Sequence, residues 1–115
     1  MTSNPNARIA LLVDDDRDSR DVHRQILEWF GWTVIAIARG EAAVRAARQH
    51  TPDVTLLDLL MPGMDGGEVL ARLRHDPRTN TVPIVAVTGV PEWLDEHPEL
   101  AKQFDGVLLK PVSSE

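Results

Sequence analysis

Five short apolar runs alternate with helix-length segments along this chain of 115 residues. Each run is too short for a helix and stops at or beside a polar residue, which is typical of a strand buried on both faces of a sheet. The runs span residues 9–13, 33–38, 54–60, 84–87 and 106–109. Buried strands separated by helices predict βαβ crossovers, and therefore an α/β fold in which one parallel sheet carries helices on both faces.

The segments between the runs contain signals that start and stop helices. Asp16 or Asp18 is placed to cap a first helix, and Gly31 is placed to end it. A second helix is expected over residues 40–50, and a third begins after Asp65 as its cap. These helices have the lengths that crossovers between parallel strands require.

The last helical segment, residues 92–104, contains a proline. Its apolar side chains recur at helical spacing, but Pro98 lies in the middle. Proline lacks an N–H and clashes with the preceding turn, so it predicts a kinked helix or two short pieces. We interpret Trp29, Trp32 and Trp93 as core or helix-face packing rather than as a cofactor site.

Composition limits the classes of protein that this chain can represent. Twelve Lys and Arg against 18 Asp and Glu give a net charge of −6, which argues against nucleic-acid binding. A hydrophobic fraction of 43% fits one globular domain, and the absence of cysteine excludes disulfides and thiolate sites. With no apolar stretch long enough for a signal peptide or a membrane span, we expect a cytoplasmic protein that binds no membrane.

Polar side chains collect where the predicted strands end. Asp14 and Asp15 follow the first strand, Asp58 belongs to the third, Thr88 ends the fourth, and Lys110 follows the fifth. The carboxyl ends of parallel strands lie at one edge of the sheet, which is where such sheets bind ligands. We therefore expect three carboxylates, one hydroxyl and one ammonium group in a single site.

Such a site suits phosphoryl transfer to a carboxylate. Three carboxylates repel one another unless a divalent cation joins them, and oxygen ligands alone favour magnesium. Lys110 and Thr88 add a positive charge and a hydroxyl donor for phosphoryl oxygens, and transfer depends mainly on positioning and charge neutralisation. Asp58 is the chosen acceptor, because a lone carboxylate within a run of leucines is costly to bury unless a charged group meets it.

In these residues, and in their order and separation, the chain resembles the receiver domains of response regulators in two-component signalling. The resemblance extends over residues 9–111 and implies a flavodoxin-like three-layer sandwich with five parallel strands in the order 2-1-3-4-5. The motifs that carry it are Val13-Asp14-Asp15, Asp58 with the following Met61-Pro62-Gly63-Met64-Asp65-Gly66, Val87-Thr88-Gly89 and Lys110-Pro111.

The resemblance implies a phosphorylation-dependent switch rather than an enzyme in the usual sense. A sensor histidine kinase or a histidine phosphotransfer protein would donate the phosphoryl group, and Mg²⁺ would be required, with Mn²⁺ able to substitute. The implied roles are phosphoacceptor for Asp58, phosphoryl binding for Thr88 and Lys110, and metal binding for Asp14, Asp15, Asp58 and the backbone carbonyl of Leu60. We also expect autophosphorylation from small phosphodonors, and slow self-dephosphorylation because apolar Leu60 and Val90 cannot orient an attacking water.

The chain departs from the family pattern at its C-terminal end. Val107 replaces the usual aromatic residue on the fifth strand, so we expect a weaker or differently routed conformational change. We divide the chain into a flexible N-terminal segment, residues 1–8, and a receiver domain, residues 9–115, that is truncated before the family's fifth helix. A partner would then cover the bare flank, either a fused output domain or a second copy of the chain in a homodimer.

Two other functions fit parts of the sequence. A haloacid-dehalogenase-like phosphatase would use Asp14 as the nucleophile and Asp16 as the general acid, but it would leave Asp58 unexplained. A pseudo-receiver would act only by binding other proteins. The histidines show no ligand spacing, and we interpret them as surface or boundary residues: His23, His50, His75 and His97.

Overall fold

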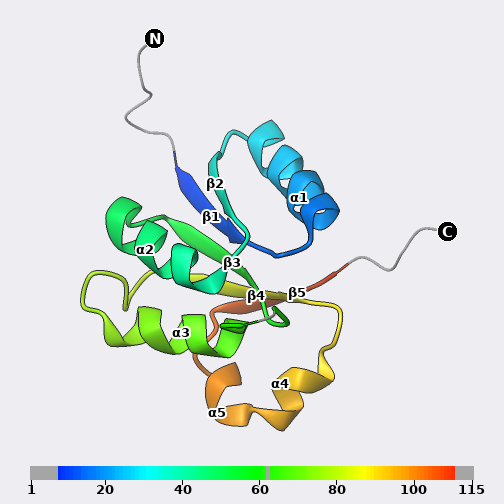
Figure 1. The fold of residues 1–115 in the computed structure, drawn as a ribbon, viewed down its shortest axis with the longest axis vertical. Helices are drawn as coiled ribbons and strands as arrows, with labels where there is room; N and C mark the ends of the chain where they lie inside the picture. Colours follow the sequence, from blue (N-terminus) through cyan, green and yellow to red (C-terminus); the bar gives the residue numbers. More distant parts are fainter. Residues whose placement is uncertain (1–7, 62, 111–115) are drawn as a thin grey trace, which may run out of the picture.

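Five parallel strands form one sheet in the order β2-β1-β3-β4-β5 (Figure 1). The computed structural model describes residues 8–61 and 63–110. This order confirms the predicted flavodoxin-like sheet, although β3 ends at Asp58 and not at residue 60. The strands are β1 (Ile9–Val13), β2 (Thr33–Ile37), β3 (Val54–Asp58), β4 (Ile84–Thr88) and β5 (Gly106–Leu109).

Helices connect consecutive strands, as the alternation of runs predicts. Pro98 begins a separate short helix, so the segment that contains it forms two pieces. No described helix is both long and apolar enough to cross a membrane. The helices are α1 (Arg17–Trp29), α2 (Gly40–His50), α3 (Gly66–His75), α4 (Glu92–Glu96) and α5 (Pro98–Ala101).

The caps of α1 and α3 come from the aspartates that the sequence offers. Asp16, and not Asp18, caps α1, and its carboxylate accepts a hydrogen bond of 2.9 Å from the Ser19 N–H. Asp65 caps α3 through the N–H of Glu68 at 3.0 Å. Each cap begins its helix directly after a loop at the carboxyl edge of the sheet. The two caps therefore fix where α1 and α3 start relative to that edge.

The main core lies between the sheet and the pair α2 and α3. Its side chains are fully or almost fully buried, and burial of each large aliphatic side chain contributes about 1.5–3 kcal/mol. Gly66 brings α3 close to β3, since a Cβ at that position would lie 2.6 Å from the Asp58 carbonyl oxygen. The core consists of Leu11, Val13, Ala43, Val44, Ala47, Leu57, Met61, Val69, Leu70, Leu73 and Ile84.

The opposite face of the sheet carries α1, which lies beside β1 and β2 (Figure 1). Apolar side chains of α1 stay in solvent: Trp29 is 85% exposed, Phe30 74% and Val22 53%. The interpretation of Trp29 as packing is therefore wrong, because helical periodicity identifies an apolar face but not whether another element covers it. Leu108 of β5 is also about half exposed. The predicted truncation falls on residues 111–115, which lie outside the described residues.

Candidate functional site

Backbone pairing brings the ends of the strands to a common edge. The Asp14 N–H donates to the Ile37 carbonyl at 3.0 Å, and the Lys110 N–H donates to the Thr88 carbonyl at 2.8 Å. Asp58, the last residue of β3, pairs with Val87 of β4. The five residues predicted to meet are thus held on neighbouring strands, and two of them continue the pairing just beyond a strand end.

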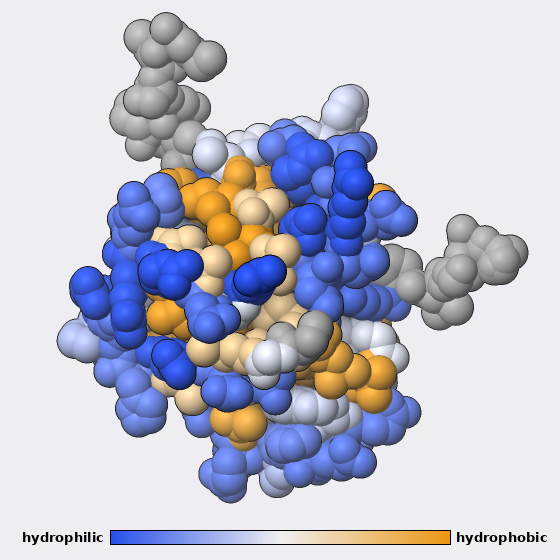
Figure 2. Space-filling view, in the orientation of Figure 1, coloured by the Kyte–Doolittle hydropathy of each residue, from blue (hydrophilic) through white to orange (hydrophobic). Residues whose placement is uncertain are grey.

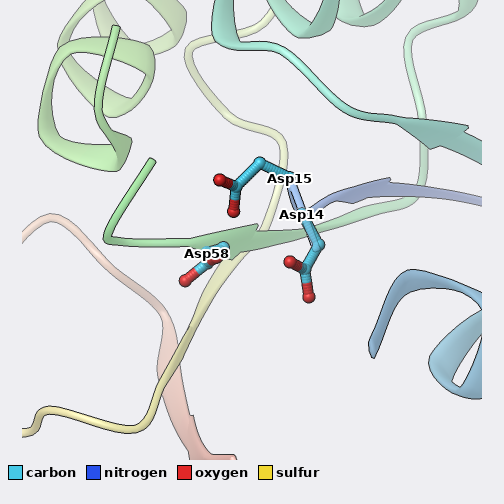
Figure 3. A group of neighbouring side chains, drawn as sticks. All are labelled: Asp14, Asp15 and Asp58. Atoms are coloured by element: carbon cyan, nitrogen blue, oxygen red, sulfur yellow. The ribbon is translucent and has the colours of Figure 1, made fainter. Parts of the chain in front are cut away.

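Asp14, Asp15 and Asp58 are neighbouring side chains at the ends of β1 and β3 (Figure 3). One oxygen of each lies within 4.8 Å of the others. Asp14 and Asp58 are buried while Asp15 is exposed, so the cluster opens to solvent on one side. Carboxylate oxygens with room for water are the ligands that Mg²⁺ prefers, and the donor set therefore fits that ion.

Lys110 supplies the positive charge of the site. Its Nζ lies 3.3 Å from Oδ2 of Asp58 and 3.6 Å from Oδ2 of Asp14. Burial by itself would lower the pKa of Lys110, but the two facing carboxylates outweigh burial and raise it. The ammonium group therefore stays charged, and it is available to phosphoryl oxygens as well as to Asp58.

Asp58 is held in a state that resists ionisation. Burial raises its pKa to about 6, and the nearby Asp14 carboxylate adds to the increase, although Lys110 and a hydrogen bond from the Leu60 N–H oppose it. The pKa of an ordinary aspartate is about 3.9. A group with this combination of burial and like charge gains from the arrival of a cation, which is typical of functional carboxylates.

Asp14 is held by donors that sequence reasoning missed. The Asp16 N–H donates to its Oδ1 at 2.9 Å, and the Ser19 hydroxyl lies 2.7 Å from its Oδ2. Arg20 also donates to its backbone carbonyl at 2.9 Å. The available signal was a serine in the first turn of the helix that Asp16 caps, which places a hydroxyl next to the end of β1.

Leu60 and Thr88 are close to Asp58 in the fold: the Leu60 N–H donates to Asp58 Oδ1 at 3.3 Å, and Thr88 follows Val87, the residue that pairs with Asp58. Thr88 is buried, and its Oγ1 accepts a hydrogen bond of 2.9 Å from the Val90 N–H, which leaves the hydroxyl proton for another acceptor. The side chains of Leu60 and Val90 are 48% and 42% exposed, so both apolar groups border the site at its solvent side. The use of the Leu60 carbonyl as a metal ligand stays a prediction.

An open cleft of about 520 Å³ adjoins the carboxylates. It is lined in part by the loop between β2 and α2, and Figure 2 shows hydrophilic and apolar residues side by side on this face of the molecule. It gives a reactant a solvent-accessible approach to the exposed carboxylate. Its lining residues are Asp15, Ala38, Arg39, Gly40, Glu41 and Gly63.

Two further predictions concern residues around the site. Val107 of β5 lies opposite Ala86 of β4 and is 45% exposed, so no aromatic side chain fills that position. The histidines are half-buried or exposed, which confirms their interpretation as boundary or surface residues. Asp16, the general acid of the phosphatase alternative, is exposed and engaged in capping α1.

Comparisons with known proteins show the family to which the chain is similar. Residues 10–115 match the family model of the response regulator receiver domain. The chain is 34% identical to protein PilH of Pseudomonas aeruginosa, over 95% of this chain and 89% of PilH. It is also 34% identical to the transcriptional regulatory protein AfsQ1 of Streptomyces coelicolor, over 89% of this chain but only 44% of AfsQ1.

A solved structure gives the same result for the fold. The receiver domain of sensor histidine kinase PA1611 from Pseudomonas aeruginosa superposes with a TM-score of 0.84 at 29% identity. The match covers 93% of this chain and 88% of that domain, whose structure has a magnesium ion coordinated in its active-site cleft. The chain thus spans nearly all of some relatives and less than half of others.

Proposed function

The chain belongs to the response regulator receiver domain family, whose members are phosphorylation-dependent signalling switches, and from this premise we propose that Asp58 accepts the phosphoryl group. The observation that carries this choice is the Lys110 ammonium at 3.3 Å from Oδ2 of a nearly buried Asp58. Asp14 has both oxygens engaged by donors from its own loop and helix, and Asp15 is exposed. Asp14 is also buried near Lys110, but Asp58 lies closer to the ammonium, at 3.3 Å against 3.6 Å, and its carboxylate accepts one backbone N–H, that of Leu60.

In the proposed reaction, an oxygen of Asp58 attacks the phosphorus of a phosphohistidine. A P–O bond to Asp58 forms, the P–N bond to the donor imidazole breaks, and the electron pair leaves with that imidazole. Lys110 and the Thr88 hydroxyl hold the phosphoryl oxygens. Mg²⁺, held by Asp14, Asp15, Asp58 and the Leu60 carbonyl, supplies neutralising charge when bound. Mn²⁺ is also a hard cation that suits oxygen ligands, and it could substitute.

The proposed partners follow from the same surface features. A sensor histidine kinase or a histidine phosphotransfer protein would bring its phosphohistidine to the open carboxylate edge in the cytoplasm. The exposed apolar side chains of α1 and Leu108 would be covered by a fused output domain or, in a homodimer, by a second copy.

Phosphorylation would act as a switch through its charge. It adds about −1.5 to −2 charges next to Thr88, whose hydroxyl keeps a proton to donate to the new group. Movement of Thr88 toward the phosphoryl group would shift Val90, since the two are joined by a hydrogen bond. Val107 offers no aromatic ring to follow that movement, so we expect the change to spread through the loop after β4.

The test uses acetyl phosphate and Mg²⁺ with mass analysis of the products. We expect one base-labile phosphoryl adduct at Asp58, absent in Asp58→Asn and retained in Asp95→Asn, an exposed aspartate of α4. The adduct should decay slowly, because Leu60 and Val90 present no group that orients water. Labelling at Asp14 with rapid turnover would favour the phosphatase alternative, and a chain that is never labelled would favour the pseudo-receiver.

A further inference from the structure

Two polar side chains of α1 connect the surface of the helix to the carboxylate site. The Ser19 Oγ lies 2.7 Å from Oδ2 of Asp14, and the His23 Nδ1 lies 3.4 Å from that same Oγ. Ser19 and His23 are one helical turn apart, so both face the end of β1. Both are half-buried, whereas Asp14 is only 1% exposed.

The number of available protons fixes the direction of this chain of hydrogen bonds. An ionised Asp14 can only accept, so the single hydroxyl proton of Ser19 points to Asp14. The Ser19 oxygen can then only accept from His23, which requires the proton of the neutral imidazole to be on Nδ1. The order is therefore from His23 Nδ1–H to Ser19 O–H to Asp14 Oδ2.

We propose that Ser19 and His23 are positioning residues that orient Asp14 for the cation, an inference that rests on the proposed function. The Asp16 N–H holds one carboxylate oxygen and Ser19 holds the other, so the carboxylate plane cannot rotate freely. In this orientation, one oxygen of Asp14 lies within 4.8 Å of an oxygen of Asp15 and of an oxygen of Asp58, the two residues beside it in Figure 3. Loss of a hydrogen-bond partner of a metal ligand commonly lowers metal affinity about 10–100-fold.

His97 provides an internal reference for the predicted tautomer. Its Nδ1 lies 2.7 Å from the Trp93 carbonyl oxygen, which can only accept, so His97 must also carry its proton on Nδ1. Ser19 does not touch this pair. Exposed His50 should instead show the Nε2–H form that free imidazole favours in water.

The first measurement is ¹⁵N NMR of the histidine rings in the metal-free protein at pH about 8.5, where histidine is ordinarily neutral. In the wild type, His23 and His97 should both be Nδ1–H tautomers. Ser19→Ala should convert His23 to the Nε2–H form and leave His97 unchanged. A wild-type His23 in the Nε2–H form would overturn the proposed direction of the hydrogen bonds.

The second measurement is calorimetric titration with Mg²⁺ in the unphosphorylated protein. Ser19→Ala should lower Mg²⁺ affinity about tenfold, while Ser19→Thr keeps the hydroxyl and should bind nearly as the wild type does. Gln25→Ala, at an exposed position of the same helix, is the control and should bind normally. Unchanged Mg²⁺ affinity in Ser19→Ala would overturn the positioning role.

Failure of the proposed function gives a different result. If Asp14→Asn binds Mg²⁺ as tightly as the wild type, the assigned metal site is wrong, and so is any positioning of Asp14 for a cation. The histidine tautomers are read without metal, so they still decide whether the hydrogen-bond chain exists. Weak binding by Ser19→Ala together with a lost Nδ1–H signal supports both the site and the positioning role.

Discussion

Asp58 and Asp76 lie at opposite ends of the β3–α3 unit and differ in the hydrogen-bond donors and charged groups that surround their carboxylates. Both side chains are nearly buried, with residue exposures of 4% and 8%. Burial raises the pKa of Asp58 to about 6, while hydrogen bonds from Arg78 lower the pKa of Asp76 to about 2. Two carboxylates of similarly low exposure thus have pKa values shifted in opposite directions, because burial is the largest cause at Asp58 and hydrogen bonds from Arg78 are the largest cause at Asp76.

The carboxylate oxygens of Asp76 have several donors. The Arg78 backbone N–H and guanidinium both donate to it, and Arg48 of α2 reaches it at 2.6 Å. Asp58 has one ammonium and one N–H, both at 3.3 Å, and a carboxylate neighbour. At one end of the unit, the Asp76 carboxylate joins α2 to the loop after α3. At the other end, the Asp58 carboxylate has fewer donors, and a bound cation would stabilise its ionised form.

The largest expected effect is an opposite change in stability when each carboxylate is neutralised. At pH 7 without Mg²⁺, Asp58→Asn should increase the free energy of unfolding by on the order of 2 kcal/mol, because it removes a buried charge whose ionisation the fold disfavours. Asp76→Asn should lower the stability, since two arginines lose their shared acceptor. Urea denaturation of both variants measures the two signs.

A variant that carries both Asp58→Asn and Asp76→Asn tests whether the two effects on stability are independent. The two sites lie at opposite ends of the unit and share no partner, so their effects should add within a few tenths of a kcal/mol. Saturating Mg²⁺ should reverse the ranking of Asp58→Asn and the wild type, because only the wild type keeps all three carboxylates. Loss of stability in Asp58→Asn without Mg²⁺ would contradict the inference that the buried charge of Asp58 destabilises the fold.

The second effect is a pH dependence that covers a different pH range at each end. Mg²⁺ must displace the proton of Asp58, so apparent Mg²⁺ affinity should fall about tenfold between pH 7 and pH 5. The folded pKa of Asp76 is depressed, so its stabilisation is present above the unfolded value and is lost as the pH falls toward about 2. Calorimetric Mg²⁺ titrations and acid denaturation measure the two ranges.

Asp76→Asn is the control for this pH experiment. It should keep the wild-type dependence of Mg²⁺ affinity on pH, because Asp76 does not belong to the carboxylate cluster. It should also lose less stability than the wild type between pH 4 and pH 2. A flat Mg²⁺ affinity from pH 7 to pH 5 in the wild type would show that Asp58 is already ionised in that range.

The contrast between the two ends explains what could be predicted from the sequence. The functional end follows a general rule, since parallel strands bring their carboxyl ends together, and Asp14, Asp58 and Lys110 each follow or end an apolar run. The neutralised end is local only in part, because Arg78 lies two residues after Asp76 but Arg48 does not. Arg48 is distant from Asp76 in the chain, and only the packing of α2 against α3 brings them together.

Other misses have the same physical cause. The sequence does not indicate that Ser19 contacts Asp14. The entry angle of α1 determines this contact, and no periodicity in the sequence encodes that angle. Trp29 belongs to an apolar helical face, but the pattern does not reveal which neighbour would bury it. Capping and the break at Pro98 depend on adjacent residues only, so the sequence limited the cap of α1 to Asp16 or Asp18 and predicted either a kink or a split at Pro98.

The smallest expected effect is the change in the free energy of unfolding when a buried, uncharged hydroxyl is removed. It shows what burial costs a polar group that carries no charge. Thr55 lies on β3 with Asp58 and is fully buried, and its Oγ1 has no hydrogen-bond partner among the described residues. Thr55→Val should therefore raise the free energy of unfolding by about 1 kcal/mol, because it removes an unsatisfied hydroxyl and keeps the branched shape. Urea denaturation at pH 7 measures the change.

Thr79→Val is the matched control for Thr55→Val, because Thr79 is equally buried but its hydroxyl donates to the Leu73 carbonyl at 2.7 Å. That substitution should lower the free energy of unfolding by about 1 kcal/mol, since it removes the shorter of two hydrogen bonds to the Leu73 carbonyl and leaves only the Asp76 N–H at 3.4 Å. Opposite signs for the two threonines would show that hydrogen-bond satisfaction decides the cost of a buried polar group. Equal destabilisation would mean that packing decides it, and the strain at Asp58 would then have to arise from its charge alone.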